Sequence, residues 1–477
     1  MAGRDRDEEM LHIVMFPWLA FGHLIPFLEL SNRLAEMGHR ISFVSTPRNI
    51  QRLLPNTSPN SSSHQLNFIS LPLPRVENLP DQAESTTDLP IDDVPYLKKA
   101  YDGLQVPLSN FLESSKPDWI IHDFISYWVP SMAAKHGIPS VFLSLFNASF
   151  NAFVGPPSIS ESSRSNPEQL CLPPEWIPFP SNLAFRKHEI ASLSNNLAAN
   201  VSGATDVFRF AKAVEDCSFV AIRSSMELEP EMFNLLEQKL FEKPVVPIGF
   251  LPPPRQDKQE YDWARISDWL DKHKQGSVTY VALGTEAALS QQEITEMALG
   301  LELSDLPFFW VLRKPSGFTE DPFGMLPVGF EERTKGRGYL CNGWAPQPRI
   351  LGHASVGCFL THCGWNSIIE GFVSGCSLVL LPFIHDQAIN ARMLVWKNMG
   401  LEIERDDKDG LLTRESVSRA LRTVQVEEEG QSLKYRAKAK ELKEMFGDKV
   451  QNDKYLEDFI RHLKVHKSIR RLTSSNV

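Results

Sequence analysis

Residues 355–381 constrain the fold more strongly than any other stretch of the chain. They begin with a short apolar run, SVGCFL, which has the length and composition of a buried strand. A polar turn, THCG, leads into a helix in which Ile368, Ile369 and Phe372 repeat at helical spacing until Gly375 ends it. A further strand follows. Strand, turn, helix and strand in this order predict a βαβ unit, the building block of a parallel sheet.

The same alternation of strands and helices occurs in both halves of the chain. A chain of 477 residues exceeds what one hydrophobic core serves, so we expect two domains. Residues 251–262 contain three successive prolines followed by mostly polar residues, which favours a linker. The expected strands are 12–16, 41–44, 67–71, 119–122, 140–144, 219–223 and 245–247 before the linker, and 277–283, 308–312 and 355–360 after it. The expected helices are 23–37, 93–114, 128–136, 230–240 and 291–303, with a helical and richly charged region at 413–466.

The turn after residues 355–360 has the composition of a nucleotide site. The start of its helix presents unpaired backbone N–H groups and the positive end of the helix dipole, which suit a phosphate. His362, Asn366 and Ser367 are short-range donors around it. Glu370 lies one helical turn beyond Asn366 and could accept hydrogen bonds from two ribose hydroxyls. Trp344 offers a flat face on which a base could stack.

Composition narrows the class of protein. A net charge of −10 and an isoelectric point of about 5.8 argue against a nucleic-acid partner. The six cysteines show no C-x-x-C spacing, which favours free thiols in a reducing compartment. Acidic residues precede the apolar stretch near the N-terminus, the wrong sign for a signal peptide, and no long apolar run predicts a membrane span. We therefore expect a cytoplasmic protein.

Residues 344–387 resemble the signature sequence of plant family 1 UDP-dependent glycosyltransferases, which act on secondary products. So many matches at fixed spacing make this far more specific than a lone glycine motif. Two positions depart from the family: Ser377 stands where proline is frequent, and His385 where an aromatic or small residue is frequent. The matching positions are Trp344, Pro346, Gln347, His353, Gly357, His362, Gly364 to Ser367, Glu370, Gly375, Pro382, Asp386 and Gln387.

The resemblance implies how a UDP-sugar would be held. Residues Trp344 and Ala345 would contact uracil, and Gln347 and Glu370 the ribose. The diphosphate would lie against His362, Gly364, Trp365, Asn366 and Ser367. Asp386 and Gln387 would bind the sugar hydroxyls, although capping of the helix that begins there is a competing role. Gly284 and Thr285 follow a strand and precede a helix, so they form either a second phosphate contact or an ordinary turn.

His23 is the candidate general base. It follows the first strand at the start of a helix, and an alcohol needs a base to attack a sugar carbon. On position alone it could equally satisfy local backbone groups, but the Gly22-His23-x-x-Pro26 pattern resembles the family's N-terminal motif. Asp123 follows another strand and would orient the imidazole, with helix capping as the alternative.

The implied fold is α/β and of the GT-B type, with two Rossmann-like domains facing a central cleft. Residues 1–250 would form the acceptor-binding domain and residues 263–450 the UDP-sugar-binding domain. The last helix, at 451–477, would return to the first domain. Aromatic residues in the irregular region 146–200 could wall an apolar acceptor pocket or pack as ordinary core. They are Phe146, Phe150, Phe153, Trp176 and Phe179.

The sequence thus predicts an inverting glycosyltransferase that moves a hexose from a UDP-sugar to a hydroxyl of a small molecule. Stretches such as PWLAFGHLIPFLEL and YVALGTE resemble the subgroup that extends sugar chains on flavonoid and terpenoid glycosides. Glucose is favoured because Gln387 is retained, and UDP-rhamnose is the alternative donor. Two other classes are a non-catalytic UDP-sugar-binding protein and an epimerase-like enzyme that releases UDP without an acceptor.

No cofactor is expected, because the UDP-sugar is a co-substrate. The sequence has no D-x-D motif flanked by apolar strands and no His/Cys cluster at metal-ligand spacing. We therefore expect transfer without a metal ion, and a monomer.

Overall fold

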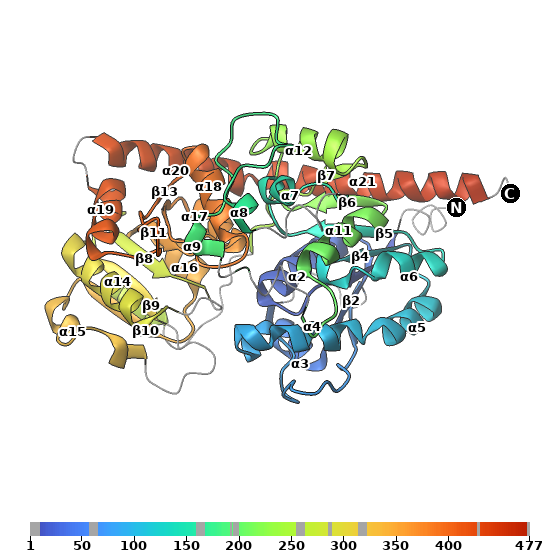
Figure 1. The fold of residues 1–477 in the computed structure, drawn as a ribbon, viewed down its shortest axis with the longest axis horizontal. Coiled ribbons are helices and arrows are strands. Elements are labelled where there is room, and N and C mark those ends of the chain that lie inside the picture. The colour runs from blue at the N-terminus through green and yellow to red at the C-terminus, as the bar shows by residue number, and fades with distance from the viewer. Residues whose placement is uncertain are drawn as a thin grey trace. The chain divides into compact units, whose positions relative to one another are not determined.

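The structure is a computed structural model that describes residues 10–56, 65–158, 167–190, 193, 200–253, 263–284, 289–312, 322–426 and 430–474 of the chain. The chain forms two compact units, each built on a parallel sheet (Figure 1). The first unit comprises Met1–Ser165, Asn195–Leu251 and Lys449–Val477, and the second comprises Asn166–Ser194 and Pro252–Asp448. The expected linker at 251–262 lies mostly outside the described residues.

The sheet of the first unit has seven parallel strands. They are β1 (His12–Phe16), β2 (Arg40–Ser45), β3 (Leu66–Ser70), β4 (Trp119–His122), β5 (Ser140–Ser144), β6 (Phe219–Ile222) and β7 (Val245–Pro247). Their order in the sheet is β3-β2-β1-β4-β5-β6-β7. The order reverses beside β1, so the carboxyl ends of β1 and β4 lie next to each other at the switch point where open α/β sheets place ligands.

Helices cover both faces of this sheet. They are α2 (Phe21–Glu36), α3 (Pro47–Leu53), α4 (Val94–Asp102), α5 (Gln105–Ser115), α6 (Val129–Lys135), α7 (Ala148–Val154), α11 (Asp206–Asp216), α12 (Pro230–Leu235), its π-helical continuation Leu236–Leu240 and α21 (Lys449–Ser474). The single helix expected at 93–114 is two helices. Gly103 lies at the break, where an added Cβ would approach Pro74 Cγ to 2.5 Å, so the chain bends past that proline.

The core of the first unit has one layer on each side of the sheet. On one side, Phe43, Trp119 and Phe219 pack with α2 and with Phe459 of α21. On the other side, Phe16 and its neighbours pack with α4, α5 and α6. The last helix is fixed further by polar bonds, since Tyr455 Oη accepts from Met226 N at 2.9 Å and Asn452 Oδ1 accepts from Phe250 N at 2.9 Å. The C-terminal helix is thus part of the first unit.

Two buried histidines make the first unit sensitive to acid. His39 Nδ1 accepts from Leu11 N at 3.2 Å, and His122 Nδ1 donates to Asp123 O at 3.0 Å. Burial lowers the pKa of each ring from 6.5 to about 4. Between these values the unfolded chain binds the proton and the folded chain does not, so stability falls as pH drops from 6.5 towards 4, by up to about 1.4 kcal/mol per pH unit per ring.

The variant His39→Asn is expected to flatten this pH dependence, because an amide oxygen replaces Nδ1 as acceptor without titrating. The slope of unfolding free energy against pH should fall by up to about 1.4 kcal/mol per pH unit. Urea unfolding between about pH 7 and pH 5 measures it. Burial raises the pKa of Glu29 to about 7, and this contribution has the opposite sign, so comparison with the wild-type protein isolates His39. An unchanged slope would contradict the assignment.

The sheet of the second unit has six parallel strands. They are β8 (Val278–Ala282), β9 (Phe308–Leu312), β10 (Gly338–Asn342), β11 (Val356–Thr361), β12 (Ser377–Leu380) and β13 (Gly400–Glu402). The order β10-β9-β8-β11-β12-β13 again reverses, between β8 and β11. The sequence analysis did not predict β10 and β13. They are the two edge strands, and their half-exposed residues lack the continuous apolar run of the central ones.

The single helical region expected at 413–466 consists of three helices, of which the first two belong to the second unit and the third, α21, belongs to the first. The helices of the second unit are α8 (Pro167–Leu170), α9 (Lys187–Ile190), α13 (Trp263–Leu270), α14 (Gln291–Ser304), α15 (Phe330–Arg333), α16 (Gln347–Leu351), α17 (Trp365–Ser374), α18 (Gln387–Trp396), α19 (Arg414–Gln425) and α20 (Gln431–Gly447). Short 3₁₀ turns lie at Leu54–Asn56, Thr86–Asp88, Ile91–Asp93 and Phe124–Ser126 in the first unit and at Pro322–Met325 in the second.

Residues 166–194 pack with the second unit, whereas the sequence analysis placed them in the first domain. A buried ion-pair network holds them there. Arg392 of α18 contacts Glu189 of α9 at 2.7 Å and Glu402 at 2.6 Å, and Arg186 contacts Glu402 at 3.0 Å. Such long-range charge pairing leaves no local sequence pattern, which explains the difference.

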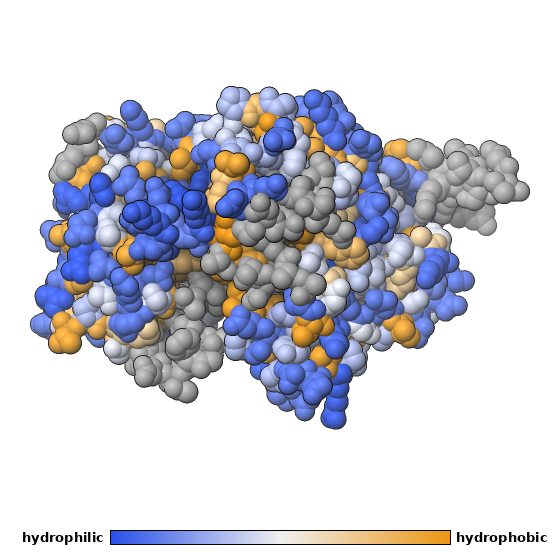
Figure 2. Space-filling view, viewed as in Figure 1, coloured by the Kyte–Doolittle hydropathy of each residue, from blue (hydrophilic) through white to orange (hydrophobic). Residues whose placement is uncertain are grey.

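No helix within the described residues is long and apolar enough to cross a membrane. Figure 2 shows hydrophilic residues over most of the described surface on the face that it presents.

Candidate functional site

His23 and Asp123 form a hydrogen-bonded pair at the sheet edge of the first unit. The strands β1 and β4 are neighbours, with Phe16 opposite His122, so the residues that follow them meet. His23 lies in the first turn of α2, and its Nδ1 is 2.7 Å from Oδ2 of Asp123. The structure therefore brings together two residues that are 100 positions apart in the sequence.

The carboxylate of Asp123 accepts two further hydrogen bonds. Trp18 N donates to Oδ2 at 3.3 Å and Phe124 N donates to Oδ1 at 2.7 Å. With both oxygens held by donors, the carboxylate is fixed as an acceptor for the Nδ1–H of His23. A neutral imidazole in that tautomer carries its lone pair on Nε2, the atom that a general base needs.

Two buried residues that the sequence analysis did not single out hold the loops of this pair. Tyr101 Oη donates to Pro17 O at 2.9 Å, beside Trp18. Arg209 Nη1 donates to Ile125 O at 2.9 Å, and the same guanidinium grips Asp102 at 2.9 and 2.6 Å. Burial of the phenol raises the pKa of Tyr101 well above its usual value, so it remains a donor. No local motif marks either residue.

Apolar rings surround His23. Phe124 and Phe146 lie with ring centroids 6.1 and 6.0 Å from the imidazole, and Phe150 lies 4.6 Å from Phe146. Phe146 and Phe150 are two of the five aromatic residues proposed for an acceptor pocket. Phe179 stacks on Trp396 within the second unit, with ring centroids 6.2 Å apart.

The turn after β11 has a strained backbone in the second unit. Cys363 adopts φ +68, the left-handed region that non-glycine residues rarely occupy. The ring of His362 packs against two glycines, because a Cβ added to Gly364 would lie 2.6 Å, and one added to Gly284 2.7 Å, from its Nε2. Only glycine at both positions leaves room for the ring. Thr285, the other proposed phosphate contact beside Gly284, lies outside the described residues.

The residues proposed for the ribose contact one another. Gln347 at the start of α16 donates through Nε2 to Glu370 Oε2 at 2.7 Å and to Ser367 Oγ at 3.4 Å, both on α17. Tyr280, on the buried strand β8, donates to Gln347 Oε1 at 3.3 Å and fixes the orientation of the amide. The sequence analysis did not predict a role for Tyr280 at this site, because a tyrosine inside an apolar strand is typical of a core residue.

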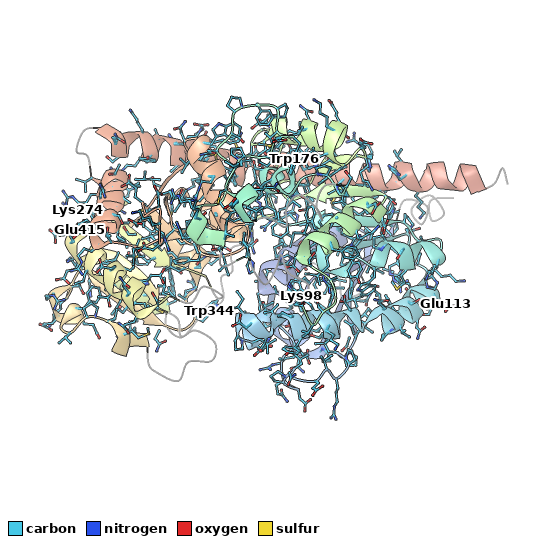
Figure 3. The ribbon with its side chains drawn as sticks, viewed as in Figure 1. Lys98, Glu113, Trp176, Lys274, Trp344 and Glu415 are labelled. Carbon is cyan, nitrogen blue, oxygen red and sulfur yellow. The ribbon has the colours of Figure 1, made fainter. Side chains whose placement is uncertain are left out.

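Three further proposed residues differ in their surroundings. Trp344 lies after β10 and is 67% exposed, as a stacking platform requires (Figure 3). Ala345 is buried, and its carbonyl accepts from Gln347 N at 2.8 Å. Trp365 is also buried and packs edge-on to Phe446 of α20, so its side chain belongs to the core. At the start of α17, Trp365 can therefore take part in an anion site only through its backbone. This limit does not apply to Asn366.

Asp386 and Gln387 begin α18 without a side-chain cap to that helix. Gln387 Oε1 accepts from the backbone N–H groups of Phe383 and Ile384, both at 3.0 Å. Asp386 Oδ2 accepts from Asn390 Nδ2 at 2.6 Å. The carbonyl of Gln387 is therefore engaged, which presents its NH₂ as a donor, while Asp386 is an acceptor. His385, where the chain departs from the family pattern, adopts φ +56.

No group of three or more His, Cys, Asp or Glu side chains that could hold a metal ion occurs among the residues that the structure describes.

Two Rossmann-like units with polar residues at the switch points of their parallel sheets make up the GT-B class of glycosyltransferases. The family model described as "UDP-glucoronosyl and UDP-glucosyl transferase" matches residues 243–449. UDP-glycosyltransferase 91C1 of Arabidopsis thaliana is 47% identical over 96% of this chain and 98% of its own length. Soyasaponin III rhamnosyltransferase of Glycine max is 39% identical over 98% of each chain.

The fold is also that of a solved structure. The crystal structure of UGT73P12 of Glycyrrhiza uralensis matches with a TM-score of 0.77 and 23% identity over 98% of this chain and 99% of that one. The chain belongs to the UDP-glycosyltransferase family and transfers a sugar from a UDP-sugar to secondary metabolites. The predicted family, GT-B fold and enzyme class are confirmed.

Proposed function

We propose that this enzyme inverts the donor's anomeric carbon in one displacement, with His23 as general base and Asp123 as its orienting carboxylate. Nε2 of His23 takes the proton of an acceptor hydroxyl while the oxygen attacks the anomeric carbon and UDP leaves. An α-linked glucose donor then gives a β-glucoside. The observation that carries the proposal is the 2.7 Å contact between His23 Nδ1 and Asp123 Oδ2, which fits a neutral base with its lone pair on Nε2.

We assign acceptor binding to the first unit, whose sheet edge carries His23, Phe124 and Phe146. Rings about 6 Å from the imidazole centroid suit the apolar face of a phenolic or terpenoid aglycone. The carboxylate of Asp123, bonded to His23, stabilises the imidazolium that forms as the proton moves from the acceptor hydroxyl. This stabilisation lowers the barrier to transfer only if the acceptor hydroxyl reaches Nε2 of His23.

We assign the UDP-sugar to the second unit. Trp344 and Ala345 would contact uracil, and Gln347 and Glu370 the ribose. The helix start at Gly364 to Ser367, with His362, would stabilise the diphosphate as it leaves, because backbone N–H groups and a helix dipole favour developing negative charge. This assignment supports transfer without a metal ion. Gly284 and Thr285 would provide a second contact to the phosphates.

The donor sugar is the finer question, and we favour glucose. Gln387 presents an amide donor and Asp386 a carboxylate acceptor. The pair can therefore bind two neighbouring sugar hydroxyls, of which one accepts from Gln387 and the other donates to Asp386. The family description names glucosyl transferases beside glucuronosyl transferases, so glucose is among the donors that the family description covers. Rhamnose is the second candidate, and the 39% identity to the soyasaponin III rhamnosyltransferase supports it. The anthocyanidin 3-O-glucoside 2''-O-glucosyltransferase of Ipomoea purpurea, 35% identical over 95% of this chain, favours a glycoside as acceptor.

We also propose that the protein is a cytoplasmic monomer. All six cysteines are free thiols, which suits a reducing compartment.

A donor-by-acceptor screen tests the proposal. The protein is incubated with UDP-glucose or UDP-rhamnose and with matched flavonoid and triterpenoid aglycones and glucosides, with and without EDTA. Mass spectrometry then identifies products. We expect a hexose adduct on a glycoside, unaffected by EDTA, whereas a deoxyhexose adduct would establish the rhamnose alternative. Release of UDP without any adduct would instead indicate the epimerase-like reaction and contradict the proposal.

A further inference from the structure

We propose that Asn390 is a positioning residue that couples the diphosphate turn to the sugar-binding carboxylate of Asp386. One amide group hydrogen-bonds to both segments, so each is held in place by the other. This inference rests on the proposed binding of UDP at residues 362–364 and of the sugar at Asp386. It adds a residue that makes no contact of its own with either group.

The geometry is that of a bridge. Asn390 lies one turn into α18 and is fully buried. Its Nδ2 donates to Asp386 Oδ2 at 2.6 Å and to Cys363 O at 3.0 Å. Cys363 follows β11 and Asp386 follows β12, and these strands are neighbours in the sheet. The two N–H groups of one side chain thus join the ends of adjacent strands, at the edge where the ligand groups would bind.

Each of the two segments needs an external restraint. Cys363 is held at φ +68, a conformation that persists only when the surroundings impose it. The bond from Asn390 fixes the carbonyl of this residue, and therefore the peptide plane that it shares with the N–H of Gly364. Asp386 Oδ2 accepts from Asn390 Nδ2 at 2.6 Å, so Asn390 orients the carboxylate. A charge-assisted bond to a buried amide is well suited to that task.

A merely structural role would be ordinary for a buried asparagine, since buried polar groups need partners. The two roles differ in what they do to ligand binding. A structural role predicts loss of stability with unchanged discrimination between UDP and UDP-sugar. Coupling predicts two effects of removing the amide. The affinity for UDP falls because the turn is no longer held, and the extra affinity that the sugar gives UDP-sugar is lost because Asp386 is no longer oriented.

Binding by calorimetry with UDP and with UDP-glucose separates these outcomes. We expect Asp386→Ala to weaken UDP-glucose and leave UDP unchanged. Asn390→Ala should weaken UDP by about 5- to 20-fold, the effect of one buried hydrogen bond. In the double variant, the loss for UDP-glucose should be smaller than the product of the two single losses, because the residues act as one unit.

Two further variants make the test decisive. Asn390→Asp keeps the shape but sets a carboxylate against Cys363 O and Asp386, so it should weaken both ligands at least as much as alanine, and it replaces alanine if that variant does not fold. Ile389→Val, at the adjacent buried position of α18, is the matched control and should leave both affinities unchanged. Thermal unfolding shows that each variant is folded.

A UDP affinity equal to wild type in a folded Asn390→Ala or Asn390→Asp variant would overturn the coupling. So would a double variant whose loss of UDP-glucose affinity equals the product of the losses in the two single variants. The proposed function fails differently. If the wild-type protein does not bind UDP, or if Asp386→Ala leaves UDP-glucose binding unchanged, the assignment of the donor site is at fault and not the bridge.

Discussion

The variant His23→Ala is expected to lose sugar transfer by about 10²- to 10⁴-fold, the range that general-base catalysis supplies. Alanine cannot take the proton of the acceptor hydroxyl, and water is a far weaker base near neutral pH. UDP binding should remain within about twofold, because the residues assigned to UDP lie in the second unit and His23 lies in the first. Initial rates with a saturating donor, together with calorimetry of UDP, measure the two effects.

His136→Ala is the matched control for this experiment. His136 belongs to the same unit and bonds through Nε2 to Ser109 Oγ at 2.8 Å, but it caps α6 and lies away from the residues assigned to catalysis. It should retain wild-type transfer. If His23→Ala transfers sugar at the wild-type rate, His23 is not the base, whatever the contact to Asp123.

The central strands were predictable because they are buried on both faces. Trp119–His122, Ser140–Ser144 and Phe308–Leu312 have the predicted bounds to the residue, since a continuous apolar run between turn signals has few other structures available. The edge strands β10 and β13 were missed, although the edge strands β3 and β7 were predicted, because β10 and β13 lack a continuous apolar run. Solvent contact allows polar residues and glycine there, and the run disappears.

The candidate site was predictable where residues carry a ligand-binding pattern. His362, Gln347 and Glu370 were named from the signature, and the structure brings Gln347 and Glu370 within 2.7 Å. Tyr280 and Asn390, which support those residues, were not named. Their role depends on the acceptor that each buried donor meets in the folded chain. For Tyr280 and Asn390 that acceptor is Gln347 or Cys363, which lies far away in the sequence. Local periodicity cannot encode it.

The placement of residues 166–194 shows the same limit for domain boundaries. The sequence supports a boundary at the proline-rich segment after residue 250, because linkers have a composition of their own. It offers no such signal for a segment that packs through a few buried charges. Arg392 is matched by Glu189 and Glu402, and only the folded chain shows which carboxylates complete the pair. Breaking such a pair leaves a buried charge, so the segment stays with the second unit.

The variant Asp123→Asn is expected to lower transfer by up to about 10⁴-fold, although asparagine has the same shape. The reason lies in the donors around the carboxylate. Phe124 N donates to Oδ1 at 2.7 Å, while Trp18 N and His23 Nδ1 face Oδ2 at 3.3 and 2.7 Å. If the amide oxygen takes the place of Oδ1, the NH₂ faces His23. Nδ1 must then accept, the ring proton moves to Nε2, and Nε2 can no longer act as a base.

The opposite orientation of the amide does not rescue the enzyme. If the oxygen faces His23, the NH₂ opposes the backbone N–H of Phe124, and a buried donor is left without its acceptor, at a cost of about 1–3 kcal/mol. Asp118→Asn is the matched control, since Asp118 precedes the same strand at its other end and accepts from His12 N at 2.9 Å. It should leave the rate unchanged. A wild-type rate in Asp123→Asn would show that the carboxylate only caps the turn, and that the imidazole tautomer is set elsewhere.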